Sequence, residues 1–103
     1  MYARVISFSG ADPGKREAAI ELIRGTVIPM LQTYDGYGGY LALYDADANR
    51  AKGIILWESR EAADAAEETL VERRAKMTAH VGISVESVEL YEAPVLDLAG
   101  ARV

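Results

Sequence analysis

The sequence contains no cysteine and only one histidine among its 103 residues. Without cysteine there is no disulfide, no thiolate nucleophile and no thiolate metal site. One histidine is too few for a histidine-based metal cluster within one chain. We therefore expect neither a metal nor a cofactor. The formal net charge of -5 also disfavours binding to nucleic acid or to anionic membranes, because both reward a basic surface.

Long apolar runs are missing as well. No segment reaches the ~18 uninterrupted apolar residues that a membrane-spanning helix needs. The chain starts directly with a strand-like pattern and lacks the basic and apolar stretches of a signal peptide, so we expect a cytoplasmic location. A chain of 103 residues has room for one domain. We predict a single domain over residues 1–103, with a core of about 2–93 and an extended C-terminal tail.

The apolar residues that are present predict two strand–helix–strand units. Spacings of three and four predict one helix from Lys15 to about Tyr34 and another from Arg60 to about Val81. Four segments rich in β-branched and aromatic residues are typical of strands. These segments are Tyr2–Phe8, Tyr37–Tyr44, Lys52–Glu58 and Val85–Glu92.

Several residues mark where these helices begin, bend and end. Asp12, which precedes a proline, favours the start of the first helix, and Ser59 favours the start of the second. Pro29 lacks a backbone N–H, so we expect a kink or break near Val27–Ile28 with a short final turn after it. Gly82 suits the end of the second helix.

This order of elements predicts an α+β fold of the ferredoxin-like, split β-α-β type. Its four-stranded antiparallel sheet would carry both helices on one face. The second and third strands are apolar on both alternating faces, so the face away from the helices would be bare and larger than soluble monomers usually show. We predict a homodimer in which two copies pair through this sheet face. The alternative is a monomer whose tail, Val95–Val103, folds over the sheet.

Few side chains offer acid–base or aromatic chemistry. His80 is the only side chain whose ordinary pKa lies near neutrality, which makes it a candidate acid or base; alternatively it only interacts with the end of its helix. Tyrosines gather around the second strand and could orient an aromatic ligand, or serve as strand and interface residues. They are Tyr34, Tyr37, Tyr40 and Tyr44.

Arg4 and a charged run on the second helix are the charged features that need an interpretation. Arg4 stands in an otherwise apolar strand and could anchor a carboxylate or phenolate. The interpretation that we favour is an ion pair with an acid such as Glu89, or with the partner subunit. The charged run from Glu67 to Lys76 is interpreted as a solvated helix face.

Three segments resemble the antibiotic-biosynthesis monooxygenase-like family of the dimeric α/β-barrel superfamily. They are Val27–Leu31, Asp35–Tyr40 and Leu56–Ala62. The resemblance covers about residues 2–93 and implies a homodimer whose two sheets form a barrel. It also implies a cavity between sheet and helices in each subunit. Some members of the superfamily are cofactor-independent oxygenases of polyphenolic substrates, some degrade haem, and many have no assigned activity.

The haem-degrading members place an asparagine on the first strand and a tryptophan and a histidine on the second helix. Here the first strand offers Ser7, the second helix has no tryptophan, and His80 lies at the helix end. The residues therefore argue against haem degradation. Trp57 resembles the tryptophan that the family carries at a strand end, which is not the catalytic one.

Two functions stay open. The first is a cofactor-independent monooxygenase acting on a small aromatic or polyketide-like molecule, with His80 or Tyr34 assisting proton transfer. The residues expected to line its pocket are Tyr37, Trp57 and Arg4. The second is a non-catalytic homodimer with a structural role or a small bound ligand. A closed cavity of ~300 Å³ or more beside His80 or Tyr34 would favour the enzyme. A cavity filled by aliphatic side chains would exclude it, namely Leu22, Ile23, Leu70 and Met77.

Overall fold

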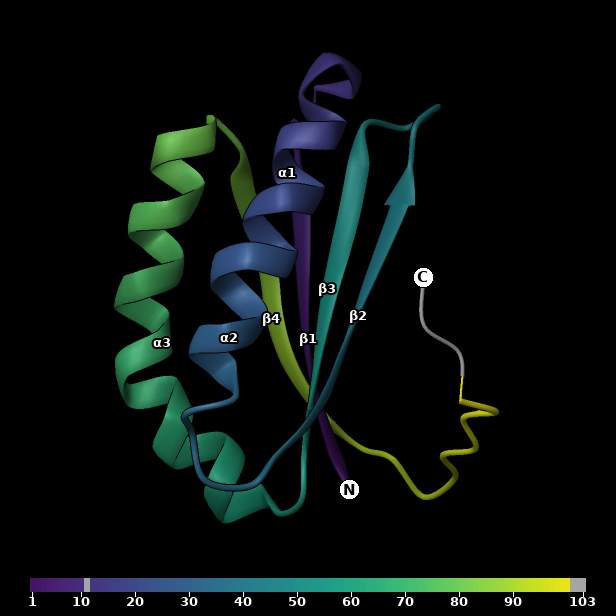
Figure 1. Ribbon diagram of the computed structural model, residues 1–103, viewed down its shortest axis with the longest axis vertical. Helices are drawn as coiled ribbons and strands as arrows, with labels where there is room; N and C mark the ends of the chain where they lie inside the picture. The colour runs from purple at the N-terminus through teal and green to yellow at the C-terminus, as the bar shows by residue number, and fades with distance from the viewer. Residues whose placement is uncertain (11, 101–103) are drawn as a thin grey trace.

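The computed structural model describes residues 1–10 and 12–100 as one sheet covered on one face by helices (Figure 1). Its strand order is β2-β3-β1-β4, and every neighbouring pair is antiparallel. The strands are β1 Tyr2–Ser9, β2 Tyr37–Asp45, β3 Arg50–Trp57 and β4 Ser84–Glu92; the helices are α1 Arg16–Leu22, α2 Ile28–Leu31 and α3 Arg60–Val81. The predicted α+β, ferredoxin-like fold is therefore confirmed.

The first helical region is interrupted just before Pro29, as the sequence predicted. The Asp12 carboxylate accepts a hydrogen bond from a backbone N–H of the first turn. After α1 the chain forms a π-helical segment, Ile23–Val27, in which the N–H of Ile28 donates to the carbonyl five residues earlier. Helix α2 follows as a single short piece with Pro29 in its first turn. A proline removes one intrahelical donor and crowds the preceding turn, which accounts for the wider pairing at this point.

Helix α3 begins and ends on the predicted caps. The Ser59 hydroxyl accepts a hydrogen bond of 3.1 Å from the Ala62 N–H, and Gly82 ends the helix in the left-handed conformation with φ of 74°. These two caps give the sharp boundaries of a long, otherwise uninterrupted helix.

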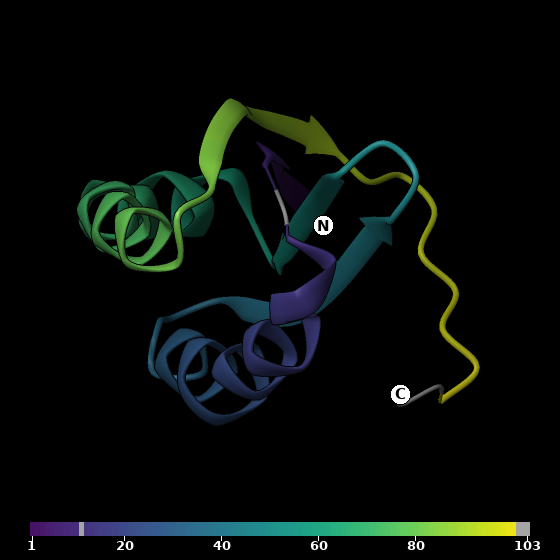
Figure 2. The ribbon, with the colours of Figure 1, turned by 90° about the horizontal axis from the view of Figure 1, so that it is seen from above.

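The core lies between the helices and the sheet. Figure 2 shows α3 beside the α1–α2 region on the same face, with the C-terminal tail on the other side. Ile55 and Trp57 of β3 point toward the helices, since both pack in one cluster with residues of α2 and α3. The whole cluster consists of Ile6, Leu31, Ile55, Trp57, Ala63, Ala66 and Leu70.

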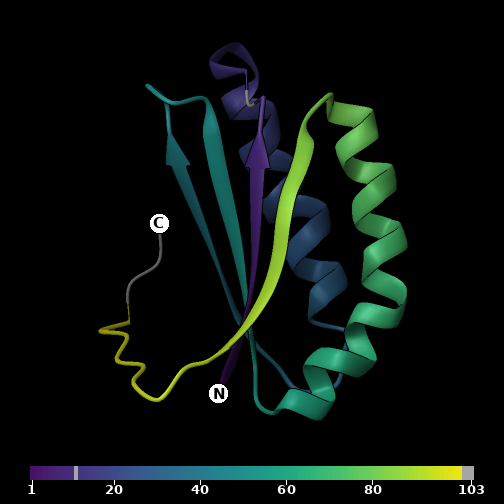
Figure 3. The same cartoon turned by 180° about the vertical axis from the view of Figure 1, so that it is seen from behind.

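The opposite sheet face carries no helix (Figure 3). The strand register places Leu41, Ile54, Val5 and Glu89 in one row across the four strands. Leu41 and Leu43 of β2 are 48% and 45% exposed, and Tyr91 of β4, which stands opposite Ala3, is 52% exposed. Apolar side chains are therefore exposed at both edges of this face. At the β4 edge the row ends in a carboxylate.

The C-terminal tail does not cover that face. Val95 is 84% exposed and Leu98 is 68% exposed, and the strand leucines stay open to solvent beside them. The predicted alternative of a tail folded over the sheet is therefore wrong for the part of the tail that the structure describes, and the homodimer stays a prediction. The last three residues, 101–103, lie outside that part.

Gly36 is the glycine on which the loop before β2 depends, and its substitution gives a first prediction. Its φ is +80°, and a Cβ there would lie 2.5 Å from the Ala62 Cβ. We expect Gly36→Ala to lower the free energy of unfolding by about 2–4 kcal/mol, since left-handed strain adds to overpacking. The measurement is urea unfolding at fixed protein concentration. Gly25→Ala is the matched control because nothing lies within 4 Å of its Cβ position; an equal loss in both variants would contradict the prediction.

Candidate functional site

An aromatic cluster marks one end of the space between the helices. Trp57, at the end of β3, is only 1% exposed. The rings of Tyr34 and Tyr37 meet it edge-on, with centroid distances of 6.2 and 6.1 Å. The loop that carries both tyrosines is held against the end of β3, because the Glu58 N–H donates a 2.8 Å hydrogen bond to the Gly36 carbonyl. Three of the residues expected at the site therefore do come together.

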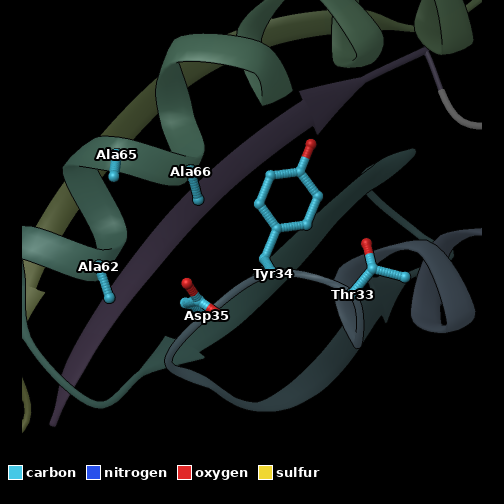
Figure 4. Close-up of a pocket in the computed structure, with 6 residues that line it drawn as sticks. All are labelled: Thr33, Tyr34, Asp35, Ala62, Ala65 and Ala66. Carbon is cyan, nitrogen blue, oxygen red and sulfur yellow. The ribbon is translucent and has the colours of Figure 1, made fainter.

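A cavity of about 290 Å³ opens beside this cluster. Figure 4 shows the Tyr34 ring across from α3, which contributes Ala62, Ala65 and Ala66 to the lining of the cavity. Small side chains on α3 leave this space, and a 2.8 Å hydrogen bond between the hydroxyls of Tyr34 and Thr69 joins the two sides of the gap. The cavity is lined by Thr33, Tyr34, Asp35, Ala62, Ala65 and Ala66.

A charged cluster lies beneath α3, where the sequence predicted a solvated face. The guanidinium of Arg74 donates two hydrogen bonds of 2.8 Å to the Glu67 carboxylate. Their side chains are only 10% and 22% exposed. The Nε atom of Arg4 lies 3.8 Å from the same carboxylate. The interpretation of the charged run as a solvated face is thus wrong for Glu67 and Arg74, which point inward and pair.

Arg4 forms ion pairs within the protein, but its partners are acids of α3 and not the predicted Glu89. Its Nη2 donates to the Ala63 carbonyl and to the Asp64 carboxylate, each at 3.4 Å. Its buried Nε has no hydrogen-bond partner among the described residues. Glu89, the strand acid considered as its partner, lies on the other face of the sheet, because Arg4 stands opposite Leu90 in the register.

Two titratable groups at the charged cluster, Glu67 and Tyr40, have pKa values that are shifted further from neutral pH. Burial raises the pKa of Glu67, but the hydrogen bond and charge of Arg74, together with Arg4, outweigh it and hold that pKa below its usual value. Burial raises the pKa of Tyr40, with a further rise from Tyr37 and a smaller opposing effect of Arg74. At neutral pH Glu67 is therefore an anion, and the Tyr40 hydroxyl is a proton donor.

His80 lies in a different cavity. It is exposed near the end of α3 and lines a second space of about 360 Å³ with residues of α1 and α2. Thr69, which holds the Tyr34 hydroxyl, is eleven residues earlier on the same helix, or about 16 Å along its axis. The two candidate catalytic residues therefore do not face one ring-sized ligand together.

Of the four aliphatic side chains considered as possible fillers, one lies in the core, two line the second cavity, and Ile23 is half-buried in the π-helical segment. Leu70 is 4% exposed and packs in the core, whereas Leu22 and Met77 line the cavity that contains His80. Both cavities are open to solvent. The structure therefore shows neither of the two predicted alternatives, a closed cavity or a cavity filled by aliphatic side chains.

Sequence reasoning missed the Glu67–Arg74 pair, although a signal was present. Positions 63, 67, 70 and 74 follow spacings of four and three, so they share one helix face with the buried Ala63 and Leu70. Helical periodicity alone places both charges toward the sheet. Their exposure was inferred from residue type and not from that spacing.

None of the described helices combines the length and the hydropathy that crossing a membrane requires. Among residues 1–10 and 12–100, histidine, aspartate and glutamate side chains form no group of three that could hold a metal ion.

Comparison with known proteins defines the fold and no more. No protein-family model matches the chain, and no curated protein sequence matches it. Solved structures do match. A candidate antibiotic biosynthesis monooxygenase from Deinococcus radiodurans is 16% identical with a TM-score of 0.70, covering 97% of this chain and all of its own. Another from Nitrosomonas europaea is 22% identical with a TM-score of 0.61, covering 92% and 100%.

A third match carries a ligand. It is a monooxygenase from the gene ActVA-Orf6 of Streptomyces coelicolor, in complex with Nanaomycin D. It is 15% identical with a TM-score of 0.62, and the match covers 94% of this chain and 92% of that one. The resemblance to antibiotic-biosynthesis monooxygenases is therefore confirmed at the level of the fold.

Proposed function

We propose that this protein is a cofactor-independent monooxygenase that acts on a small aromatic or polyketide-like phenol bound on the helix side of the sheet. One observation carries the proposal. An edge-on aromatic cluster of Tyr34, Tyr37 and Trp57 lies next to a buried charged cluster holding two guanidinium groups and one inward-facing carboxylate. Aromatic walls suit a ring system, and the buried Nε of Arg4, which has no hydrogen-bond partner among the described residues, is a donor that suits its phenolate form.

The chemistry needs no external reductant. A methylene group activated by a neighbouring phenolate can give its electrons directly to O₂, so that the CH₂ becomes a carbonyl and one water leaves. The substrate carbon supplies all the electrons that the oxygen molecule takes up. The protein's part is to bind the ring, favour the anion and move a proton. In this proposal Arg4 and Arg74 favour the anion, Trp57 supports the pocket wall, and Tyr34, which lines the cavity, moves the proton.

The test uses the single tryptophan as a reporter. We expect 1,8-dihydroxyanthrone to quench the fluorescence of Trp57, which touches two residues of the site, and to be oxidised to the anthraquinone with one O₂ consumed per molecule. Tyr34→Phe should lower kcat/KM at least about tenfold, whereas His80→Gln changes a residue of the other cavity and should leave kcat/KM unchanged. Oxygen uptake is followed with an electrode. Oxidation no faster than in buffer alone, without quenching, would overturn the proposal.

The alternative is a non-catalytic ligand-binding homodimer, and the pKa directions favour it. Glu67 is held ionised, while the pKa values of Tyr37 and Tyr40 are raised by burial. None of the three is therefore suited to exchange a proton near neutrality. The same titration separates the two functions: quenching of Trp57 without oxygen uptake above the uncatalysed rate would identify a binder.

We also propose that the protein is a homodimer that pairs through the open sheet face. The exposed Leu41 and Leu43 support it, as does the absence of a helix over that face in the described chain. This pairing leaves the helix side of each protomer free for ligand. A cytoplasmic location stays a prediction.

A further inference from the structure

The second cavity has a composition unlike the rest of this acidic protein. It lies between the α1–α2 region and the C-terminal half of α3, on the side away from the open sheet face (Figure 2). Its volume of about 360 Å³ falls within the range of small-molecule sites. The lining residues are Leu22, Met30, Arg73, Lys76, Met77 and His80. Three of them are apolar, three are basic, and no carboxylate is among them.

The basic groups here are not neutralised by strong ion pairs. Within the described residues, neither Arg73 nor His80 lies within ion-pair distance of a carboxylate. Lys76 has Glu72 at 3.8 Å, with both side chains more than three-quarters exposed. A pair of that kind is worth little. The rim therefore keeps its positive charge although the whole chain has a formal net charge of -5.

We propose that this cavity is a binding site for a small aromatic carboxylate, separate from the Trp57 cluster. The ring would lie against the thioethers of Met30 and Met77, which make favourable contacts with aromatic rings. The carboxylate would face Arg73 and Lys76 at the rim, where the planar guanidinium can hold it through two hydrogen bonds. This site does not depend on the proposed oxygenase activity, because it shares no lining residue with the cavity beside Tyr34.

The three methionines of the chain allow a direct test. Protein labelled with ¹³C at the methionine methyl groups is titrated with 1-naphthoate and, separately, with 1-naphthylmethanol, which has the same rings and no charge. We expect naphthoate to shift the Met30 and Met77 signals in a saturable way and to leave Met1, which lies near Gly38 in β2, unmoved. The neutral alcohol should bind about five- to tenfold more weakly.

Variants identify the charges that matter. Arg73→Gln with Lys76→Gln should weaken naphthoate binding about five- to tenfold and leave binding of the alcohol unchanged. The matched control is Arg50→Gln with Lys15→Gln, which removes the same charge from exposed positions outside the cavity and should change neither affinity. Equal affinity for the acid and the alcohol would overturn the proposal, as would Met30 and Met77 signals that do not move with naphthoate.

Discussion

Arg74→Met is expected to lower the free energy of unfolding by about 2–4 kcal/mol at neutral pH. The substitution keeps an unbranched apolar stem but leaves the largely buried Glu67 carboxylate without the two hydrogen bonds that Arg74 donates. Arg4, at 3.8 Å, compensates only in part. An unpaired buried charge costs more than the net worth of the pair, so the loss should exceed that of an ordinary surface substitution.

The pH dependence of this loss follows from the pKa of Glu67. In the native protein that pKa is below the ordinary value of about 4.3. The carboxylate therefore stabilises the fold above that pH and loses its contribution as the pH falls through the lowered pKa. In Arg74→Met, burial still raises the pKa of Glu67, but the hydrogen bonds and the charge of Arg74 no longer lower it. The difference in unfolding free energy between wild type and variant should thus narrow as the pH falls from about 7 to about 3.

Two controls separate the pair from its neighbours. Arg73→Met changes the adjacent residue, which is exposed and forms no ion pair among the described residues, and should cost less than about 0.5 kcal/mol. Glu67→Met combined with Arg74→Met should regain much of the loss, since no charge is left unpaired. Urea unfolding at fixed protein concentration measures all four proteins. Equal costs for Arg73→Met and Arg74→Met would contradict a buried pair.

The elements of the fold were predictable because their signals are local. Segments rich in β-branched and aromatic residues located the four strands within one or two residues, and Ser59 and Gly82 located the ends of α3. Pro29 located the interruption of the first helical region. Each of these signals acts through backbone donors or side-chain direction over a few residues, so tertiary context did not override them.

The candidate site was predictable only in part, because it depends on which charged groups turn inward. The rings of Tyr34, Tyr37 and Trp57 are in contact, but of these three residues only Tyr34 lines the cavity. The partner of Arg4 could not be read from the sequence without the register, which puts Glu89 on the other face. The distance from His80 to Tyr34 follows from helix rise only once the contact between Tyr34 and Thr69 is known. That contact joins residues far apart in the chain.

Leu41→Lys is expected to convert the proposed dimer into a monomer, with a rise in the dissociation constant of about a thousandfold or more. Leu41 lies on the open sheet face in a row with Ile54 and Val5, so pairing through this face would bury it between two sheets. In a two-fold interface each substitution occurs twice. Burying an unpaired ammonium costs at least about 2 kcal/mol per copy, and about 1.4 kcal/mol is a factor of ten in affinity.

Sedimentation equilibrium at micromolar concentration measures the effect. The wild type should sediment at about twice the 11.2 kDa of the chain, and Leu41→Lys at the mass of one chain. Val71→Lys is the matched control: Val71 is 53% exposed and Leu41 48%, but Val71 lies on α3, on the helix side. It should leave association unchanged. A wild type that sediments as a single chain would rule out the sheet face as an interface.

A neighbouring substitution tests how far such an interface extends along the strands. Leu43 is as exposed as Leu41, but its row contains Lys52 and Ser7, which hydrogen-bond to each other at 2.7 Å. That row already carries an ammonium group, so its surroundings retain water more readily than the apolar row of Leu41. Leu43→Lys should therefore raise the dissociation constant less, by about tenfold. If Leu41→Lys and Leu43→Lys raised the dissociation constant equally, the water-excluded centre of the interface would include both rows.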